Sequence, residues 1–320
     1  MKYIKIIIIV FILVFGSAFR NWSGKEDLSG RITISGAFAL YPLAIKWSNE
    51  FKKENPNVQF DISAGGAGKG ITDAISKMVD IGLVSREINP EETKSGAFEI
   101  AVSKDAVVPT ISSSNPFIKK LMTKGLKKDD FQNIWITEKY KYWSKVGGGS
   151  TNAQIHVYTR SDACGAAETW AKYLGKKQED LNGVGVFGDP GLAQAVKRDA
   201  LGIGFNNLVY VFDSNTKKQT NGVRIVPIDL NGNGVIDKEE NFYDNLDQLL
   251  DAIANGKYPS PPARDLYFVT KGKPQNKLVV KFIEWVLTKG QKYVHESGYI
   301  NLSDQKIKTE LEKIGGYAFK

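Results

Sequence analysis

The chain has 320 residues, of which 42% are apolar, 11% aromatic and 24% charged. This length is enough for one large or two medium domains, and the composition excludes a disordered or collagen-like chain. The formal net charge of +8 favours anionic partners, but the basic residues are scattered along the chain, which argues against a nucleic-acid-binding protein. Cys164 is the single cysteine, which excludes an intramolecular disulfide and a CxxC metal or redox site.

The first residues have the layout of a secretory signal. Lys2 and Lys5 precede an apolar run over 6–15, and small residues follow at 16–18. The run is shorter than the ~20 apolar residues that span a bilayer, so we favour a signal peptide over 1–18 rather than a retained anchor. No cysteine follows the run, which argues against a bacterial lipoprotein. We therefore expect an exported protein, located in the periplasm or at the outer face of the cytoplasmic membrane.

Strand-like and helix-like segments alternate along the rest of the chain. Short β-rich runs occur at 31–35, 58–63, 81–84, 107–111, 155–159, 184–187, 202–205, 224–228 and 266–270. Amphipathic or apolar helices are predicted over 42–51, after 70, and over 164–174, 191–198, 245–253 and 275–288. The alternation predicts an α/β fold with largely parallel sheets. The segments 145–152 and 257–264 have loop compositions.

The segment 229–240, DLNGNGVIDKEE, has the pattern of an EF-hand calcium loop, with Gly234 at its sixth position. Calcium prefers hard oxygen ligands, and the pattern offers one at every ligand position. Because a strand precedes the loop, we predict a single structural Ca²⁺ that stiffens it, and the alternative is a polar surface turn. The predicted ligands are Asp229, Asn231, Asn233, the Val235 carbonyl, Asp237 and Glu240.

Three other segments, 35–42, 64–70 and 160–169, each lead from a strand through small or hydroxyl residues into a helix. Helix N-termini carry unpaired N–H groups and a partial positive charge, so several that converge can hold an anion. Arg86 and Arg160 follow strands beside two of these turns and could bind tetrahedral oxygens with their guanidinium groups. The alternatives are ordinary turns and, for Arg160, a surface ion pair with a nearby aspartate.

At these segments the chain resembles the phosphate-binding proteins of ABC-type phosphate importers, within the type II periplasmic binding proteins. The resemblance extends over most of 31–303 and includes ISGAFALYPLAIKW, AGGAGKGI, VDIGLVSREINPEE, HVYTRSDACGAAETW and ARDLYFVTKG. It implies two α/β lobes with the ligand in the cleft between them. The implied first lobe is 31–105 plus 263–320, and the second is 106–262, which contains the EF-hand-like loop.

The resemblance also implies the residues that contact the anion, through backbone N–H groups and through an arginine that Asp162 braces. These residues are Leu40, Tyr41, Gly66, Ala67, Gly68, Ser85, Arg86, Arg160, Asp162, Cys164, Gly165 and Ala166.

The chain departs from the family pattern at four of these positions. Ala67, Cys164 and Ala166 replace hydroxyl residues, and Ser85 stands where one branch of the family has an aspartate that accepts a proton from phosphate. A hydrogen bond to a charged acceptor contributes about 1.5–3 kcal/mol, so these losses weaken the case for phosphate. Phosphate remains the favoured ligand, with tungstate, molybdate, arsenate and sulfate as alternatives.

The sequence thus predicts an exported, monomeric substrate-binding protein that captures phosphate for an ABC permease and is not an enzyme. A sensor or scaffold with the same fold is a second hypothesis. A third is a thiol enzyme in which Cys164, with its pKa lowered at a helix N-terminus, uses His156 as a base.

Overall fold

The computed structural model of the chain describes residues 27–147 and 152–316. The predicted signal peptide at 1–18, residues 148–151 of the predicted 145–152 loop and residues 317–320 of the first-lobe range lie outside the described residues. In the described ranges, no helix has both the length and the apolar character needed to span a bilayer.

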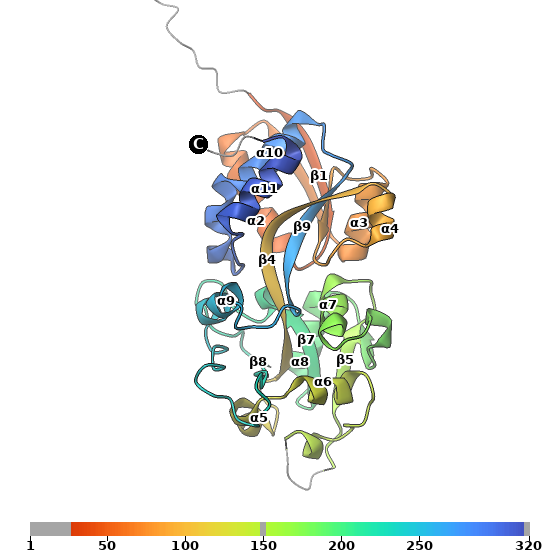
Figure 1. Cartoon of the computed structure of the whole chain (residues 1–320), viewed down its shortest axis with the longest axis vertical. Coiled ribbons are helices and arrows are strands. Elements are labelled where there is room, and N and C mark those ends of the chain that lie inside the picture. Colours follow the sequence, from red (N-terminus) through yellow and green to blue (C-terminus); the bar gives the residue numbers. More distant parts are fainter. Residues whose placement is uncertain (1–26, 148–151, 317–320) are drawn as a thin grey trace, which may run out of the picture.

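The upper part of the molecule in Figure 1 is built on a parallel group of strands flanked by helices. Strand β1 (Gly30–Gly36) lies between β2 (Val58–Ala64) and β3 (Ile81–Val84) and is parallel to both. The helices of this lobe are α2 (Tyr41–Glu54), α3 (Ala67–Ile75), α4 (Pro90–Lys94), α10 (Lys277–Leu287) and α11 (Asp304–Ile314).

The lower part repeats this arrangement with β5 (His156–Arg160), which is parallel to both β6 (Val184–Val186) and β7 (Gly202–Asn207). Strand β8 (Val223–Ile225) completes the lobe's strands. Its helices are α5 (Ile118–Lys124), α6 (Lys128–Trp135), α7 (Gly165–Tyr173), α8 (Asp189–Arg198) and α9 (Leu246–Ala254). Short 3-10 helices in the two lobes are η1 (Trp143–Lys145), η2 (Gln178–Asp180), η3 (Leu208–Tyr210), η4 (Lys289–Tyr293) and η5 (His295–Ser297).

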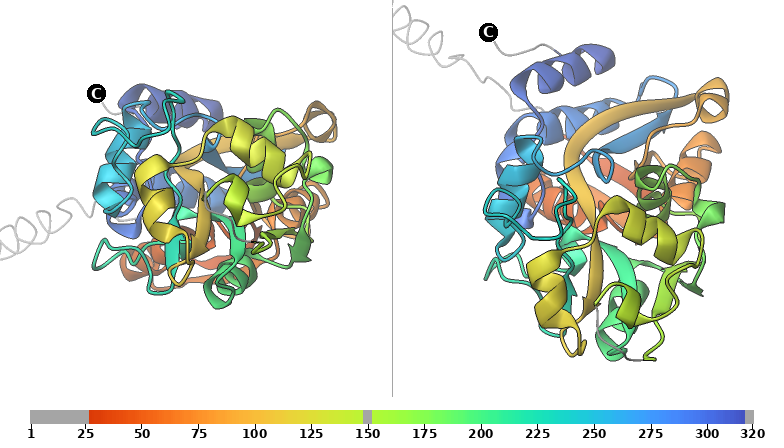
Figure 2. Two further views of the ribbon diagram at one scale, coloured as in Figure 1. Left: turned by 90° about the horizontal axis from the view of Figure 1, so that it is seen from below. Right: turned by 60° about the horizontal axis from the view of Figure 1, so that its bottom comes forward.

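Two antiparallel strands, β4 (Ala97–Ser112) and β9 (Ala263–Lys271), join the lobes. Figure 2 shows β4 running from one lobe into the other. Beyond its pairing with β9, β4 pairs antiparallel with β7 and β8 in the lower lobe. The α/β fold class is therefore confirmed, but the expectation of largely parallel sheets is wrong, because every pairing of β4 and β9 is antiparallel.

Each lobe has its own hydrophobic core. One core gathers apolar side chains from 32–102 and 266–314, and the other gathers those from 106–263 together with Ile300. Helix α2 illustrates the packing: Pro42 lies in its first turn, and Trp47 and Phe51 form part of a buried stripe facing the sheet. The change of core falls where β4 and β9 cross between the lobes, so the two lobes fold around separate interiors.

Candidate anion-binding site

The predicted anion turns meet where the two lobes touch. The Gly68 N–H in the upper lobe donates a hydrogen bond to the Ala163 carbonyl in the lower lobe at 3.2 Å. A Cβ on Gly66 would lie 3.0 Å from Asp162 Oδ2, and a Cβ on Gly165 would collide with the carbonyl oxygen and Oγ of Ser85. The turn before α7 therefore packs directly on the turns that follow β2 and β3.

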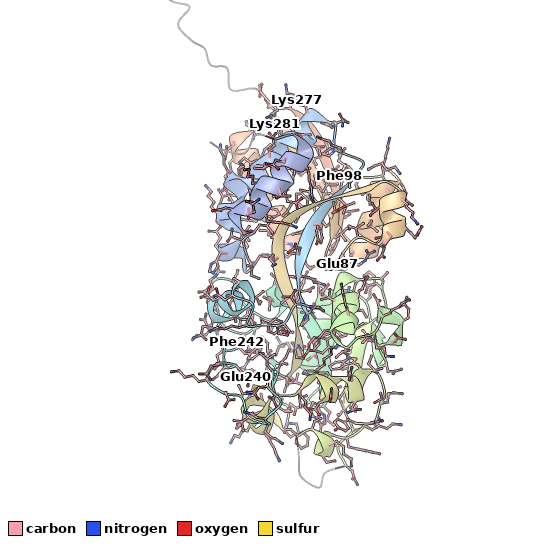
Figure 3. All side chains as sticks on the ribbon, viewed as in Figure 1. Glu87, Phe98, Glu240, Phe242, Lys277 and Lys281 are labelled. Atoms are coloured by element: carbon pink, nitrogen blue, oxygen red, sulfur yellow. The ribbon has the colours of Figure 1, made fainter. Side chains whose placement is uncertain are left out.

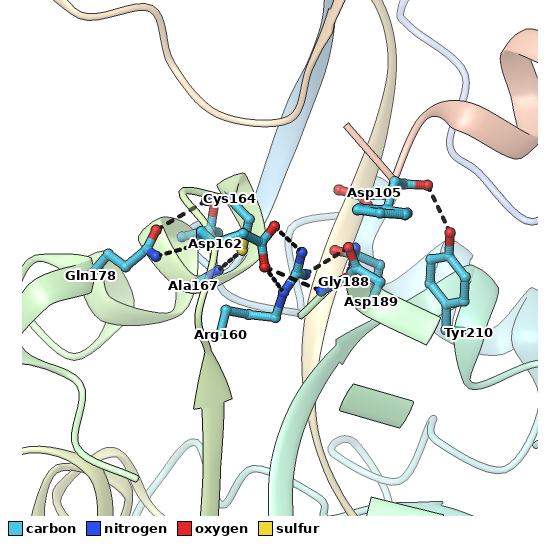
Figure 4. Close-up of polar contacts among 12 residues, drawn as sticks. Asp105, Arg160, Asp162, Cys164, Ala167, Gln178, Gly188, Asp189 and Tyr210 are labelled. Atoms are coloured by element: carbon cyan, nitrogen blue, oxygen red, sulfur yellow. Dashed lines mark hydrogen bonds and ion pairs between the residues drawn. The ribbon is translucent and has the colours of Figure 1, made fainter. Parts of the chain in front are cut away.

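Arg160, the last residue of β5, lies at this junction with a fully buried side chain. Its Nε and Nη2 donate to Asp162 Oδ1 and Oδ2 at 2.8 and 2.6 Å. The Gly188 N–H also donates to Asp162 Oδ1, at 3.2 Å. Figure 4 shows the guanidinium held by Asp162 on one side. Such a bidentate pair fixes the plane of the guanidinium.

A second carboxylate, that of Asp189, approaches Arg160 from the N-terminus of α8 (Figure 4). Its Oδ2 lies 2.7 Å from Arg160 Nη1, but among the described residues this nitrogen has no partner in hydrogen-bond geometry. Asn207 Nδ2 donates to the other oxygen, Oδ1, at 2.5 Å. Burial raises the pKa of Asp189, while the charge of Arg160 acts in the opposite direction.

The sequence analysis missed Asp189 because it placed the start of the helix near 191. The sequence did contain a signal for it. The strand at 184–186 leads through Gly188 into a helix, which is the strand-to-helix pattern of the other three turns, and this helix begins with Asp189 and Pro190.

An aromatic side chain from the upper lobe covers the guanidinium. The Phe38 ring centroid lies 5.8 Å from Arg160 Cζ, and the ring makes an edge contact with Phe187 of the lower lobe. The Tyr210 hydroxyl donates to the Phe38 carbonyl at 3.0 Å, which is another link between the lobes. Phe38 therefore lies over Arg160 only when the lobes are together.

Several predicted contributors have their backbone N–H groups in hydrogen bonds within the protein or have no side-chain donor. The Leu40 and Tyr41 N–H groups both donate to the Ala37 carbonyl at 3.1 Å, and the Gly66 N–H donates to the Gly36 carbonyl. Ala67 and Ala166 are buried at the starts of α3 and α7, and their side chains are methyl groups, so they offer only backbone N–H groups. The charged side-chain donor at the junction is thus the Arg160 guanidinium.

The Arg86 guanidinium is paired with carboxylates and is not free to bind an anion at the junction. Its Nη1 and Nη2 donate to Glu92 at 2.8 and 2.6 Å, and its Nε lies 3.0 Å from Glu168 in the lower lobe. Arg86 lines an interlobe cavity of about 440 Å³, and the neighbouring Ser85 does not. That cavity also contains Arg264 and Thr169, close to the crossing strands.

The structure separates Cys164 from His156. Cys164 is the N-cap of α7, where its Sγ accepts the Ala167 N–H at 3.3 Å, whereas His156 begins β5 and pairs with Asp199 at 2.7 Å. Burial raises the pKa of the Cys164 thiol to about 12, with Arg160 acting in the opposite direction. The lowered thiol pKa expected for an enzyme is therefore wrong, because desolvation outweighs the helix N-terminus.

The EF-hand-like loop lies in the lower lobe, as the position of Glu240 in Figure 3 shows. Asp229 accepts the N–H groups of Gly232 and Gly234 at 2.7 and 2.8 Å, and Glu240 Oε1 accepts two N–H groups from the start of the loop. Asn231 and Asn233 donate to Asp237, and Val235 is exposed. Within the described ranges, no three His, Cys, Asp or Glu side chains gather as a metal site. These oxygen atoms are of the type that calcium prefers, but in the structure they accept hydrogen bonds from N–H and amide groups of the loop itself.

Comparison with known proteins agrees with this architecture. Residues 23–289 match the family model described as a PBP superfamily domain. The phosphate-binding protein PstS of Bacillus subtilis is 26% identical over 287 residues, which cover 89% of this chain and 85% of the relative. A Clostridium perfringens protein solved with bound phosphate has a TM-score of 0.71 at 24% identity, covering 86% of this chain and all of its own. An ABC-type phosphate transport receptor from Vibrio cholerae has a TM-score of 0.62 at 18% identity, with 85% and 100% covered. The chain belongs to the PBP superfamily.

Proposed function

We propose that this protein is an exported substrate-binding protein that captures inorganic phosphate for an ABC permease. Its similarity to the Bacillus subtilis phosphate-binding protein over most of both chains supports the ligand and the transport role. The two lobes joined by two strands support a mechanism in which the anion binds at the junction and the permease recognises the closed form. This coupling requires tighter binding to the closed than to the open arrangement.

The observation that carries the ligand assignment is the state of Arg160. A guanidinium nitrogen that is buried without a hydrogen bond is costly, and proteins retain such groups where a ligand completes them. Arg160 Nη1 forms an ion pair with Asp189 at 2.7 Å but has no partner in hydrogen-bond geometry among the described residues, and it lies where three strand-to-helix turns meet. A tetrahedral oxyanion would satisfy it and would also receive the partial positive charge of the helix N-termini.

Calorimetric titration of the chain from residue 19 with phosphate, arsenate, sulfate and tungstate tests the proposal. We expect one phosphate per chain, bound more tightly than sulfate or tungstate. Absence of binding by all four anions would contradict an oxyanion carrier, and a clear preference for tungstate would replace phosphate as the ligand. The same experiment distinguishes a carrier from a sensor or scaffold that has lost its ligand.

We also propose that export uses the segment 1–18 as a cleaved signal and that the mature chain is a monomer. The charged, apolar and small-residue order of this segment supports the first point. Mass spectrometry of the chain recovered from the cell envelope tests it, since retention of residue 1 would indicate an anchor.

Finally, we propose that the loop 229–240 binds a structural Ca²⁺. The ligand pattern supports this, and binding would require Asp229, Asp237 and Glu240 to exchange their contacts with loop N–H and amide groups for the ion. The ion would supply charge neutralisation and stiffness to the loop and would take no part in anion binding.

A further inference from the structure

Helix α7 contacts the upper lobe at points beyond the anion turn that precedes it. We propose that two ion pairs between α7 and the upper lobe, called here the charge latch, hold the lobes together and so set how tightly the anion is bound. The charge latch consists of Arg86 with Glu168 and of Glu87 with Lys172. This inference rests on the proposed function and names affinity-determining residues that lie outside the anion site.

The contacts of α7 follow one face of the helix. Gly165, Glu168 and Lys172 are at positions i, i+3 and i+7, which places them on the same side of α7. In this order they meet the three successive residues 85–87, which directly follow β3. Seven residues of a helix span about 10 Å, so the contact with the upper lobe continues well beyond the anion turn at Gly165.

The inner pair of the charge latch uses a guanidinium that is fixed within its own lobe. Both terminal nitrogens of Arg86 donate to Glu92 on α4, at 2.8 and 2.6 Å, which leaves Nε for the lower lobe. Nε lies 3.0 Å from Glu168 Oε2. The Arg86 side chain is 9% exposed, so salt and water screen this pair less than an ion pair at the surface. Arg86 therefore connects the lobes.

The outer pair of the charge latch lies at the surface. Lys172 Nζ is 2.6 Å from Glu87 Oε2, and both side chains are more than half exposed. Figure 3 shows Glu87 at the level where the two lobes meet. Exposed ion pairs contribute little to folding stability. Both residues can therefore be changed without unfolding the chain, which makes the outer pair suitable for a test.

Apolar packing contributes little to the lobe contact at this position. Among the described residues, the two hydrophobic cores are separate, and all four residues of the charge latch line the interlobe cavity of about 440 Å³. The ion pairs thus bridge a space that side chains do not fill. Separation of the lobes breaks both pairs, so the charge latch stabilises the closed arrangement over the open one.

A contact that exists only in the closed arrangement acts on binding through the closed fraction. The apparent Kd equals the intrinsic Kd divided by the fraction of the protein that is competent to bind. A weaker charge latch lowers the closed fraction before the anion arrives. Phosphate affinity should therefore fall although no residue that faces the anion has changed.

Charge reversal at the outer pair tests the inference by calorimetric titration with phosphate. Glu87→Lys and Lys172→Glu each place like charges across the junction, and the double variant restores opposite charges. We expect each single reversal to weaken phosphate binding about 3- to 10-fold and the double variant to regain most of this loss. Recovery should be partial, because Lys172→Glu also places a like charge one helical turn from Glu168.

Two controls separate the charge latch from the general electric field of the protein. Glu87→Lys makes the chain more positive and Lys172→Glu makes it more negative, so a field effect would change phosphate affinity in opposite directions. The charge latch predicts a loss in both variants. Glu91→Lys and Lys94→Glu reverse an exposed pair, 2.7 Å apart within α4, that does not bridge the lobes. These two variants should keep phosphate affinity within about twofold of the wild type.

Small-angle X-ray scattering without phosphate gives a readout that does not depend on the ligand. The radius of gyration of each single reversal should exceed that of the wild type, and that of the double variant should return toward it. If the wild type binds phosphate and both single reversals keep its affinity, the charge latch is wrong and the proposed function stands. If the wild type binds no phosphate, the proposed function fails, and equal radii for all variants would then overturn the charge latch as well.

Discussion

At the scale of single residues, the site depends on one arginine more than on hydroxyl groups. Three positions that carry hydroxyls in the resembling family are Ala67, Cys164 and Ala166, and none offers a strong donor. Arg160 is fixed by Asp162, and within the described ranges its Nη1 has an ion pair with Asp189 but no contact in hydrogen-bond geometry. The main side-chain hydrogen-bond donor for the anion is therefore the guanidinium group. A lysine cannot reproduce its planar, bidentate geometry.

We predict that Arg160→Lys weakens phosphate binding by about 10- to 100-fold, which corresponds to the loss of one charged hydrogen bond. Lysine keeps the positive charge that Asp162 and Asp189 require, so the variant should fold. Calorimetric titration measures the effect, with Arg31→Lys as the control because Arg31 lies exposed on β1 beside Asp61. Unchanged affinity in Arg160→Lys would remove this residue from the site.

We predict that Cys164 in the native protein resists iodoacetamide at neutral pH and reacts only when the chain unfolds. The thiolate is the reactive form, and burial raises the pKa of this thiol to about 12, so the thiolate is scarce below that pH. Mass spectrometry of alkylated samples with and without urea measures the difference. Rapid labelling of the folded chain would revive the thiol-enzyme hypothesis.

At the scale of elements, the sequence predicts those whose residues follow one clear pattern. The strand at 81–84 is correct to the residue, and the helix expected over 164–174 is observed as Gly165–Tyr173. The sequence analysis found only the second part of β4, because its first part carries Glu99, Lys104 and Asp105, which break the apolar run.

The missing half of β4 is stabilised by a partner that is distant in sequence. Asp105 is directly opposite Arg264 on β9, 159 residues away, and accepts its Nε at 2.8 Å. No local pattern reveals such a pairing. The same holds for the site: the resemblance named Arg160 and Asp162, but the contact with Asp189 depends on how α8 packs against β5.

Gly165 shows how one element limits the approach of another. We predict that Gly165→Ala reduces phosphate affinity about 10- to 100-fold, because the added methyl would collide with Ser85 across the junction and overpacking costs about 1–3 kcal/mol. Stability of the separate lobes should change little, since the collision is between them. Gly191→Ala, which meets only a Val186 methyl at 3.2 Å, is the control. Normal affinity in Gly165→Ala would mean that the bound form holds the lobes further apart.

For the loop 229–240, we predict that Ca²⁺ raises the melting temperature of the wild type and has no such effect on Asp229→Ala. A ligand at 100 times its Kd stabilises the folded chain by about 2.7 kcal/mol. Differential scanning calorimetry with Ca²⁺ and with a chelator measures the difference, with Asp244→Ala, an exposed residue just beyond the loop, as the control. A wild type that ignores Ca²⁺ would leave the loop as a polar turn.

At the scale of the whole molecule, a series of buried, hydrogen-bonded polar residues, called here the polar chain, connects the candidate site to the crossing strands. Asp189 binds Asn207, Asn207 accepts from Arg264, and Arg264 pairs with Asp105. Arg264 Nη1 also donates to Thr169 on α7 at 3.1 Å. The residues that join the lobes are thus in contact with those that face the anion.

We predict that Asp105→Asn lowers the free energy of unfolding by about 3 kcal/mol, because it leaves the buried Arg264 without its counter-charge. Phosphate affinity should fall as well, since Arg264 no longer holds Asn207 and, through it, Asp189. Urea unfolding and calorimetric titration measure the two effects. Asp265→Asn, next to Arg264 on β9, is the control. The partners of Asp265, Lys104 and Lys306, are more exposed and lie 3.7 and 3.6 Å away. This variant should therefore change the free energy of unfolding by less than about 1 kcal/mol. If Asp105→Asn loses stability but keeps full affinity, the polar chain supports the fold without positioning Asp189.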